Sequence, residues 1–298
     1  MSVMACPVAF ISLITYNNPM KSCCIIIPIY NKSPNENEVL SIKRNCSVLK
    51  DYDIFFIHPF TMDLTAYEGL IIENFKEEIS DRPNESIADI FNDHIHFKPY
   101  KSKYFRSNKT YSRLLLSEEF YCGFFDYEYM LIAQTDTYIL NTEYSLDDFI
   151  KISCERSYDY WGAPWPDGPF GKPYTLKDRL KLTVVKHPEK LHVGNGGFSL
   201  RHVRHSMDLV RRKKNLIDFW WRFNEDMFFS WFAMDNECDY SAASWGEAKK
   251  FALETCMRSE IDKGNIPYAV HAWEKYYSAE ELTNLLTDTN LVVDGYLM

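Results

Sequence analysis

Three short apolar runs place the strongest constraint on the fold of this 298-residue chain. The first is Cys23–Tyr30, and the others are Asp53–Ile57 and Tyr129–Gln134. Short continuous apolar runs bounded by turn-forming residues are typical of parallel strands that are covered on both faces. We therefore expect three buried strands, with Asn31–Asn35 as a turn after the first of them.

The segments between and after these runs carry helical patterns. Apolar residues recur at spacings of three and four between the first two runs, which predicts one buried helical face; they are Val39, Ile42, Cys46 and Leu49. Further helices are expected over Tyr111–Phe120 and Met227–Trp231. Alternation of strands and helices predicts an α/β fold, a mostly parallel central sheet flanked by helices.

Composition narrows the class of protein. The chain is 46% hydrophobic and 16% aromatic, which is enough for a large core. Its eight cysteines show no CxxC spacing, so neither a zinc knuckle nor a disulfide framework is predicted, and a reducing compartment is favoured. The apolar stretch Val3–Tyr16 contains Pro7, lacks a basic region before it and is too short to span a bilayer. We expect a cytoplasmic protein with no transmembrane segment, in which residues 1–21 form an N-terminal extension.

Charge is distributed unevenly along the chain. The net charge of −9 argues against general nucleic-acid binding. Between Phe170 and Lys214, however, twelve Lys or Arg residues face three acidic ones. This basic 170–214 segment predicts a surface for an anionic partner, either a phosphate-bearing substrate or, in a peripheral contact, an acidic membrane face. The alternative is a solvated helix end.

Ligands of parallel sheets bind beyond the carboxyl ends of the strands. Pro28, Tyr30 and Asn31 lie at the end of the first apolar run, and Gln134 and Asp136 at the end of the third. A carboxylate at such a place suits a divalent cation, although a lone acid there can also form a turn.

A glycine-rich run and an acidic pair mark the second half of the chain. Three of the eleven glycines fall at Gly194, Gly196 and Gly197, beside Asn195, where we expect a loop that cradles a ligand with its backbone. Glu225 and Asp226 follow Asn224 at the start of a predicted helix, a pattern that a simple N-cap with an acidic first turn also explains.

Several aromatic residues and histidines can be interpreted either as core residues or as ligand-binding residues. Trp161, Gly162 and Trp165 favour a rigid sugar-stacking wall, but core tryptophans are equally consistent with the pattern. His271 lies in an apolar stretch, as a hydrogen-bonded core residue or as a ligand. His202 and His205 are three residues apart with no third ligand evident, so no zinc site is predicted.

Taken in order, Asp136, the glycine run, Glu225-Asp226 and His271 resemble the motif set of GT-A-fold glycosyltransferases. More closely, the QxD, GAPW, GNGGFSLR and ED motifs resemble a poorly characterised family of short bacterial and viral glycosyltransferases, over about residues 22–275. The resemblance implies one GT-A-like domain over 22–298. Residues 22–157 would be its nucleotide-sugar-binding half, and 158–298 its acceptor-binding and catalytic half.

The resemblance also implies roles for the site residues. Asp136 and His271 would hold Mn²⁺ or Mg²⁺ on the diphosphate, Asp226 would be the base of an inverting hexosyl or deoxyhexosyl transfer, and Glu225 would orient the acceptor. The start of the helix would favour ionised Asp226. Donor-binding residues would be Pro28, Tyr30, Asn31, Arg106, Gln134 and Asp136. Sugar-contacting residues would be Trp161, Gly162, Trp165, Asn195, Gly196, Gly197 and Glu254.

Gln134 stands where a DxD motif carries its first acid, so a metal-free enzyme that uses basic residues such as Arg106 on the diphosphate stays open. The sequence predicts a glycosyltransferase of polysaccharide biosynthesis that uses a nucleoside-diphosphate sugar and a glycan, polysaccharide or lipid-linked acceptor. One alternative is a catalytically inactive carbohydrate-binding or assembly protein. Another is a nucleotidyltransferase, although Asn31–Pro34 offers one lysine and no glycine for a phosphate loop.

Overall fold

The computed structural model describes residues 20–75, 94–140, 143–168, 191–218, 220, 223–234 and 238–288. The predicted extension 1–21, apart from its last two residues, and residues 170–190 of the basic 170–214 segment therefore lie outside the described residues. The strands are β1 (Lys21–Pro28), β2 (Asp53–Pro59), β3 (Ile95–Tyr100), β4 (Tyr127–Ala133), β5 (Thr137–Ile139), β6 (Tyr160–Pro164), β7 (Val193–His202), β8 (Ala252–Leu253) and β9 (Ala269–His271).

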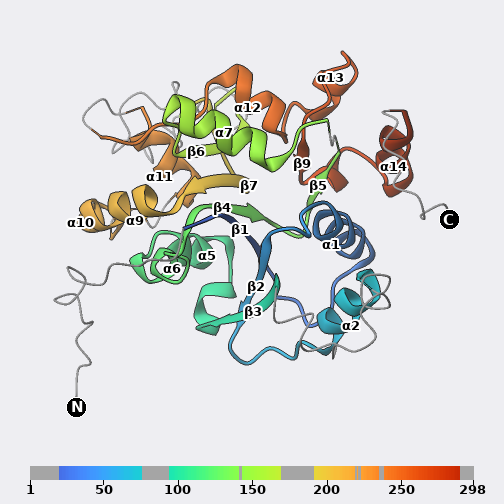
Figure 1. Ribbon diagram of the computed structural model, residues 1–298, viewed down its shortest axis with the longest axis horizontal. Helices are drawn as coiled ribbons and strands as arrows, with labels where there is room; N and C mark the ends of the chain where they lie inside the picture. Colours follow the sequence, from blue (N-terminus) through green and yellow to red (C-terminus); the bar gives the residue numbers. More distant parts are fainter. Residues whose placement is uncertain are drawn as a thin grey trace, which may run out of the picture.

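Helices surround these strands (Figure 1). They are α1 (Glu36–Val48), α2 (Thr65–Asn74), α5 (Asn108–Leu115), α6 (Glu118–Cys122), α7 (Leu146–Arg156), α9 (Val203–Arg212), α10 (Lys214–Ile217), α11 (Glu225–Phe232), α12 (Trp245–Phe251), α13 (Met257–Ile261) and α14 (Ala279–Asp288), with 3₁₀ turns η2 (Ser102–Phe105) and η5 (Trp273–Lys275). No helix among the described residues is long and apolar enough to cross a membrane.

The main sheet has six strands in the order β3-β2-β1-β4-β7-β6. The first four are parallel, and β7 runs antiparallel to both β4 and β6. The predicted mostly parallel α/β sheet is thus confirmed. Because β1 is followed by β2 on one side and bordered by β4 on the other, the strand order reverses at β1, which is where open α/β sheets bind ligands.

Both faces of the sheet are buried, which explains the continuous apolar runs. In β1, Ile26 packs toward a core formed with α5, α6, α9 and α11, whereas Ile25 and Ile27 pack toward a second core formed with α1, α2, α7 and α12. On α1, Ile42 and Cys46 are buried as the spacing predicts, as is Leu49 directly after the helix, whereas Val39 is half-buried. Figure 1 shows the two groups of helices on opposite sides of the sheet.

A second sheet of three strands, β5-β9-β8, positions the site. Thr137 of β5 pairs with His271 of β9 in antiparallel register, and Leu253 of β8 pairs with Val270 in parallel register. Asp136 precedes β5 and Glu254 follows β8, so this pairing brings both acids beside His271.

Two local expectations are wrong. Tyr111–Phe120 is not one helix, because α5 ends at Leu115 and the Ser117 hydroxyl accepts a hydrogen bond from the Phe120 amide at the start of α6. The glycine run is not a loop, because it lies within β7, between β4 and β6.

Candidate active site

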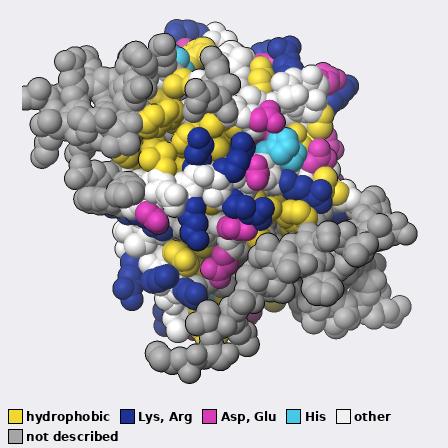
Figure 2. Space-filling model, turned by 90° about the vertical axis from the view of Figure 1, so that its left-hand side faces the viewer, with side chains coloured by type: hydrophobic (Ala, Val, Ile, Leu, Met, Phe, Trp, Pro, Cys, Tyr) yellow, Lys and Arg dark blue, Asp and Glu magenta, His cyan; other side chains and the backbone are white. Residues whose placement is uncertain are grey.

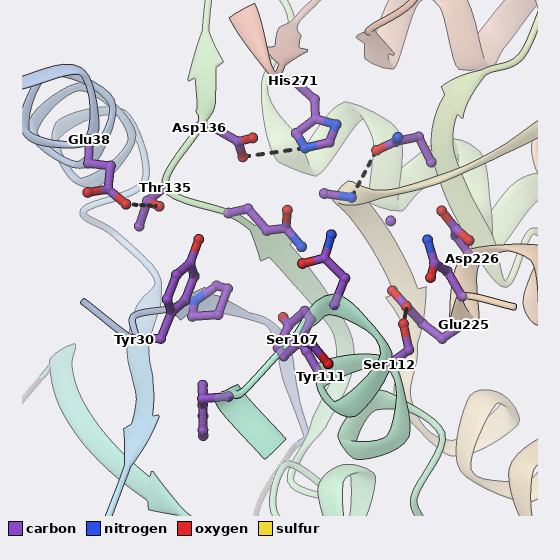
Figure 3. Close-up of a pocket in the computed structure, with 18 of the residues that line it drawn as sticks. Tyr30, Glu38, Ser107, Tyr111, Ser112, Thr135, Asp136, Glu225, Asp226 and His271 are labelled. Carbon is purple, nitrogen blue, oxygen red and sulfur yellow. Dashed lines mark hydrogen bonds and ion pairs between the residues drawn. The ribbon is translucent and has the colours of Figure 1, made fainter. Parts of the chain in front are cut away.

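A cavity of about 620 Å³ lies at the carboxyl ends of β1 and β4. Pro28 closes β1 at its edge, Gln134 and Asp136 follow β4, and the starts of α5 and α11 complete its walls. Figure 3 shows Asp136 beside His271, with Glu225 and Asp226 on another wall of the same cavity. Asp136 and Asp226, which are far apart in the sequence, therefore face one space.

Most of the predicted site residues meet at this cavity. Those that line it are Pro28, Tyr30, Asn31, Arg106, Gln134, Asp136, Asn195, Gly196, Gly197, Glu225, Asp226, Glu254 and His271. Glu254 reaches the cavity because it directly follows β8, which ends at Leu253.

The aromatic residues predicted to form a sugar platform do not line the cavity. Trp161 is fully buried, donates a hydrogen bond from Nε1 to the Ser153 hydroxyl, and packs edge-on against Phe149. Trp165 is 5% exposed, and Gly162 lies in β6 against the backbone of Asn195. This corrects the sequence interpretation: the rings fill the core and have no face free for a sugar.

Asp136 and His271 lie side by side on one wall of the cavity. Nε2 of His271 lies 3.4 Å from Oδ1 of Asp136, and the Ala272 amide donates to the Asp136 carbonyl at 2.9 Å, which ties the two segments together. Burial alone would raise the pKa of Asp136, but the hydrogen bond and charge of His271, with a contribution from Lys275, bring that pKa below its ordinary value. Asp136 is therefore held as an anion.

These residues fit a divalent cation. Nδ1 of His271 is buried without a hydrogen-bond partner, which is unusual for a buried polar atom. Glu254 lies 3.8 Å from that Nδ1 and 3.7 Å from Nζ of Lys275, and it accepts a hydrogen bond from the Asn195 amide. One carboxylate and one imidazole form a partial ligand set, which leaves coordination positions for the oxygens of a bound diphosphate.

The glycines of β7 allow side chains to approach the strand closely. A Cβ on Gly197 would lie 2.1 Å from Nε2 of His271, and one on Gly196 would lie 2.6 Å from Oε1 of Glu225. At these two positions the need for glycine comes from side-chain packing against the strand, since neither has a positive φ.

Gly197→Ala is expected to displace the His271 ring and to lower the stability of the protein by about 1–3 kcal/mol, the usual cost of overpacking. Because His271 would move away from Asp136, Mn²⁺ binding should weaken in the same variant. Gly246→Ala is the matched control, since nothing lies within 4 Å of a Cβ there. Urea denaturation and Mn²⁺ titration of both variants check this, and equal behaviour of the two would contradict it.

Glu225 is held in a buried network behind the cavity wall. Its side chain is 6% exposed, accepts a hydrogen bond from the Ser112 hydroxyl at 2.5 Å, and pairs with the guanidinium of Arg201 at 3.2 Å. Arg201 is fully buried, stacks over Tyr160 and Phe229, and also donates to the Tyr121 hydroxyl. This arrangement fixes the position of the Glu225 carboxylate at the wall of the cavity.

Asp226 differs from the sequence expectation in its electrostatics. Its pKa is raised well above the ordinary value, first by burial and second by the charge of Glu225. Its Oδ1 accepts a hydrogen bond from the Met227 amide at 2.7 Å, which lowers the pKa without offsetting those effects. The start of α11 therefore does not make Asp226 an ordinary ionised carboxylate, and its raised pKa makes it a stronger proton acceptor than an exposed aspartate.

Some cavity residues were not found from the sequence. Glu38 forms a capping box with Asn35 at the start of α1, and it also accepts a hydrogen bond from the Thr135 hydroxyl at 2.9 Å. The Asn-x-x-Glu pattern predicts a capping box at the start of a helix, but it does not indicate that Glu38 lines a cavity. Tyr111, whose buried hydroxyl has no partner, and Ser112 line the cavity from α5, inside a segment predicted only as a helix.

Comparison with solved structures identifies the fold class as that of GT-A glycosyltransferases. The galactosyltransferase LgtC, solved with donor and acceptor sugar analogues, matches with a TM-score of 0.53 at 12% identity, over 91% of this chain and 98% of that one. A glycosyltransferase involved in glycosylation of the major capsid of PBCV-1 matches with a TM-score of 0.45 at 11% identity, over 89% and 99% of the two chains. Core-mannan synthase A from Aspergillus fumigatus, in its Mn/GDP form, matches with a TM-score of 0.38 at 12% identity, over 70% and 68%.

The chain belongs to the family described as Protein of unknown function (DUF5672), whose model matches residues 94–271. The matched region includes Asp136, the glycines of β7, Glu225-Asp226 and His271. No curated protein matches the sequence of this chain.

Proposed function

We propose that this protein is a glycosyltransferase that moves a sugar from a nucleoside-diphosphate sugar to a hydroxyl group of a glycan or related acceptor. The observation that carries the proposal is the convergence of Asp136, His271 and Asp226 on one cavity at the carboxyl ends of β1 and β4. The shared fold is consistent with this activity but does not establish it.

The donor is proposed to enter at the β1 edge of the cavity. Tyr30, 57% exposed, offers a ring face, and Asn31 lies next to it. Gln134 lies at the end of β4, and Arg106 is exposed at the cavity, where its guanidinium can reach a phosphate. Pro28 shapes the floor between them.

Asp136 and His271 are proposed to hold Mn²⁺ or Mg²⁺. The bound cation would offset the negative charge that develops on the departing diphosphate. Gln134 stands at the position of the first acid of a DxD motif, so Asp136 is the one carboxylate that this motif offers to the ion. Arg106 is a second source of positive charge at the same cavity.

Asp226 is proposed to act as the general base. Its carboxylate accepts the proton of the acceptor hydroxyl while the acceptor oxygen bonds to the anomeric carbon, and the bond from that carbon to the diphosphate oxygen breaks. Asp226 and the Asp136–His271 pair occupy different walls of the cavity, which favours attack on the side opposite the leaving group and therefore inversion. Glu225, held by Arg201, is proposed to fix the position and raise the pKa of Asp226.

A donor panel tests the proposal. The protein is incubated with UDP-, GDP- and dTDP-sugars and Mn²⁺, and nucleoside-diphosphate release by slow hydrolysis is measured, followed by ¹H NMR of the first sugar released. Release from one class of donor with inverted anomeric configuration supports the proposal. Release of pyrophosphate from a nucleoside triphosphate would favour a nucleotidyltransferase, and glycan binding without release from any donor would favour a binding protein.

Asp136→Asn is expected to abolish donor hydrolysis and to weaken Mn²⁺ binding at least about tenfold, because one anionic ligand is lost. Asp167→Asn, an acid outside the cavity lining, is the matched control. Calorimetric Mn²⁺ titration and the hydrolysis assay check both variants. Full hydrolysis by Asp136→Asn in the presence of a chelator would contradict the metal assignment and leave a metal-free mechanism with Arg106.

A further inference from the structure

The histidine pair His202 and His205 gains in the structure the third ligand that the sequence does not show. His202 ends β7, and His205 lies in the first turn of α9. Asp159 lies directly before β6, and its carbonyl accepts a hydrogen bond from the His202 amide at 2.8 Å. One backbone hydrogen bond thus joins the start of β6 to the end of β7, and α9 follows β7 directly in the chain.

The side chains of these residues face one another. Nδ1 of His205 lies 2.6 Å from Oδ1 of Asp159, and Nδ1 of His202 accepts a hydrogen bond from the His205 amide at 3.2 Å. The two imidazole rings are stacked, with centroids 3.9 Å apart and an interplanar angle of 16°, so one ring must rotate about its side-chain torsions before both can bind one ion. One ligand atom from each of the three side chains lies within 4.8 Å of the other two, and among the described residues no other set of three or more His, Cys, Asp or Glu side chains comes together this closely.

A surrounding contact fixes the carboxylate. Oδ2 of Asp159 accepts a hydrogen bond from the Ser241 amide at 2.8 Å, which leaves Oδ1 turned toward the histidines. Partners of this kind orient metal ligands in known sites.

The cluster is separate from the candidate active site. β7 runs from Gly196 and Gly197 at the cavity to His202 at its far end, which corresponds to about 16 Å of extended chain. The His205 side chain is 55% exposed, so a metal ion can reach the cluster from solvent.

We propose that Asp159, His202 and His205 form a second metal site, which binds Zn²⁺ or a similar transition metal ion. Two imidazoles and one carboxylate, with water in the fourth position, are a ligand set that suits Zn²⁺. Binding replaces the hydrogen bond between His205 and Asp159, whose proton is released to solvent, and the hydrogen bond that His202 accepts at the start of α9. The bound ion links the start of β6, the end of β7 and α9.

Zn²⁺ titration calorimetry tests the site. The background is Asp136→Asn/His271→Gln, which removes the candidate active-site ligands. We expect one Zn²⁺ bound with micromolar affinity. His205→Gln should weaken binding at least about tenfold, and so should His202→Asn, in which asparagine can still cap α9. His192→Gln, which changes an exposed histidine outside the cluster, should bind as the background does. The proposal would be overturned if the background variant and the same variant with His205→Gln bound Zn²⁺ equally well. It would also be overturned if the background variant bound Zn²⁺ with a Kd no lower than about a millimolar.

Thermal unfolding of the otherwise unchanged chain gives a second readout that does not depend on the background variant. Zn²⁺ at about a hundred times its Kd should raise the Tm by roughly 5 °C, and this shift should disappear in His205→Gln. The same shift in both proteins would place the Zn²⁺ elsewhere and overturn the proposal.

Discussion

Replacing Asp226 by asparagine is expected to abolish sugar transfer and, at the same time, to raise the Tm of the protein. A general base contributes about 100- to 10,000-fold to a rate, and asparagine cannot accept the proton. The carboxylate of Asp226 is partly buried next to Glu225, and its pKa is raised well above the ordinary value. An ionised group whose pKa is raised by folding destabilises the folded state by about 1.4 kcal/mol for each pKa unit.

The sign of this effect follows from proton linkage. An acid with a raised pKa in the folded state binds more protons there than when unfolded, so it lowers the free energy of unfolding as pH rises through that range. The gain in Asp226→Asn should therefore be present at pH 8 and shrink as pH falls toward 4, which thermal unfolding at several pH values measures. In the unchanged enzyme, the acid limb of kcat/KM should lie well above pH 4. A limb at the ordinary carboxyl pKa, or a Tm that falls in the variant, would contradict this account of Asp226.

The second large effect is expected at Arg201. Its side chain is fully buried and pairs with the nearly buried Glu225. Arg201→Met keeps an apolar side chain over Tyr160 and Phe229 but leaves the carboxylate without its cation, with Ser112 as the remaining partner. Removal of one partner of a buried ion pair costs about 3–5 kcal/mol. Urea denaturation at pH 7 measures this loss.

Two further variants distinguish the loss of the buried ion pair from the effect of removing any arginine. Arg201→Met/Glu225→Gln should recover most of the lost stability, because the uncompensated charge is gone. Arg211→Met removes an exposed pair with Glu118 and should change stability by less than about 1 kcal/mol. If Arg201→Met lowered the free energy of unfolding by no more than Arg211→Met does, Arg201 would have no role in holding Glu225.

The basic 170–214 segment does not form a simple cationic surface where it is described. Arg211 and Arg212 pair with Glu118 and Asp208, and Arg204 lies over the ring of Phe125. Figure 2 shows basic and acidic side chains mixed on this side of the molecule. The proposed contact with an acidic membrane therefore rests on residues 169–190, which lie outside the described residues.

The strands of the main sheet could be predicted because a strand that is buried on both faces has apolar residues at successive positions in the sequence. β1 and β4 are continuous apolar runs for that reason, and Asp136 follows β4 at the edge where ligands of such sheets bind. The spacing of Ile42, Cys46 and Leu49 likewise reports the buried face of α1. These are local patterns, each with one physical cause.

The remaining features depend on contacts between distant residues. A glycine serves a turn and a close approach equally well, so the sequence alone could not reveal that Gly197 makes room for His271. The neighbours of Trp161 in the sequence would be the same whether its ring stacks on a sugar or packs edge-on against Phe149 in the core. The pairing of His205 with Asp159, and of Glu225 with Arg201, likewise arises only when β6, β7 and α11 come together.

The most direct test of the proposed active site is the position of Mn²⁺ in crystals grown with Mn²⁺ and the nucleoside diphosphate that the donor panel selects, located by anomalous scattering. We predict one Mn²⁺ coordinated by Asp136 and Nε2 of His271, with the diphosphate between that ion and Arg106, and with its free phosphate end directed toward Asp226. Nucleotide bound outside the cavity, or Mn²⁺ that contacts neither Asp136 nor His271, would contradict the account.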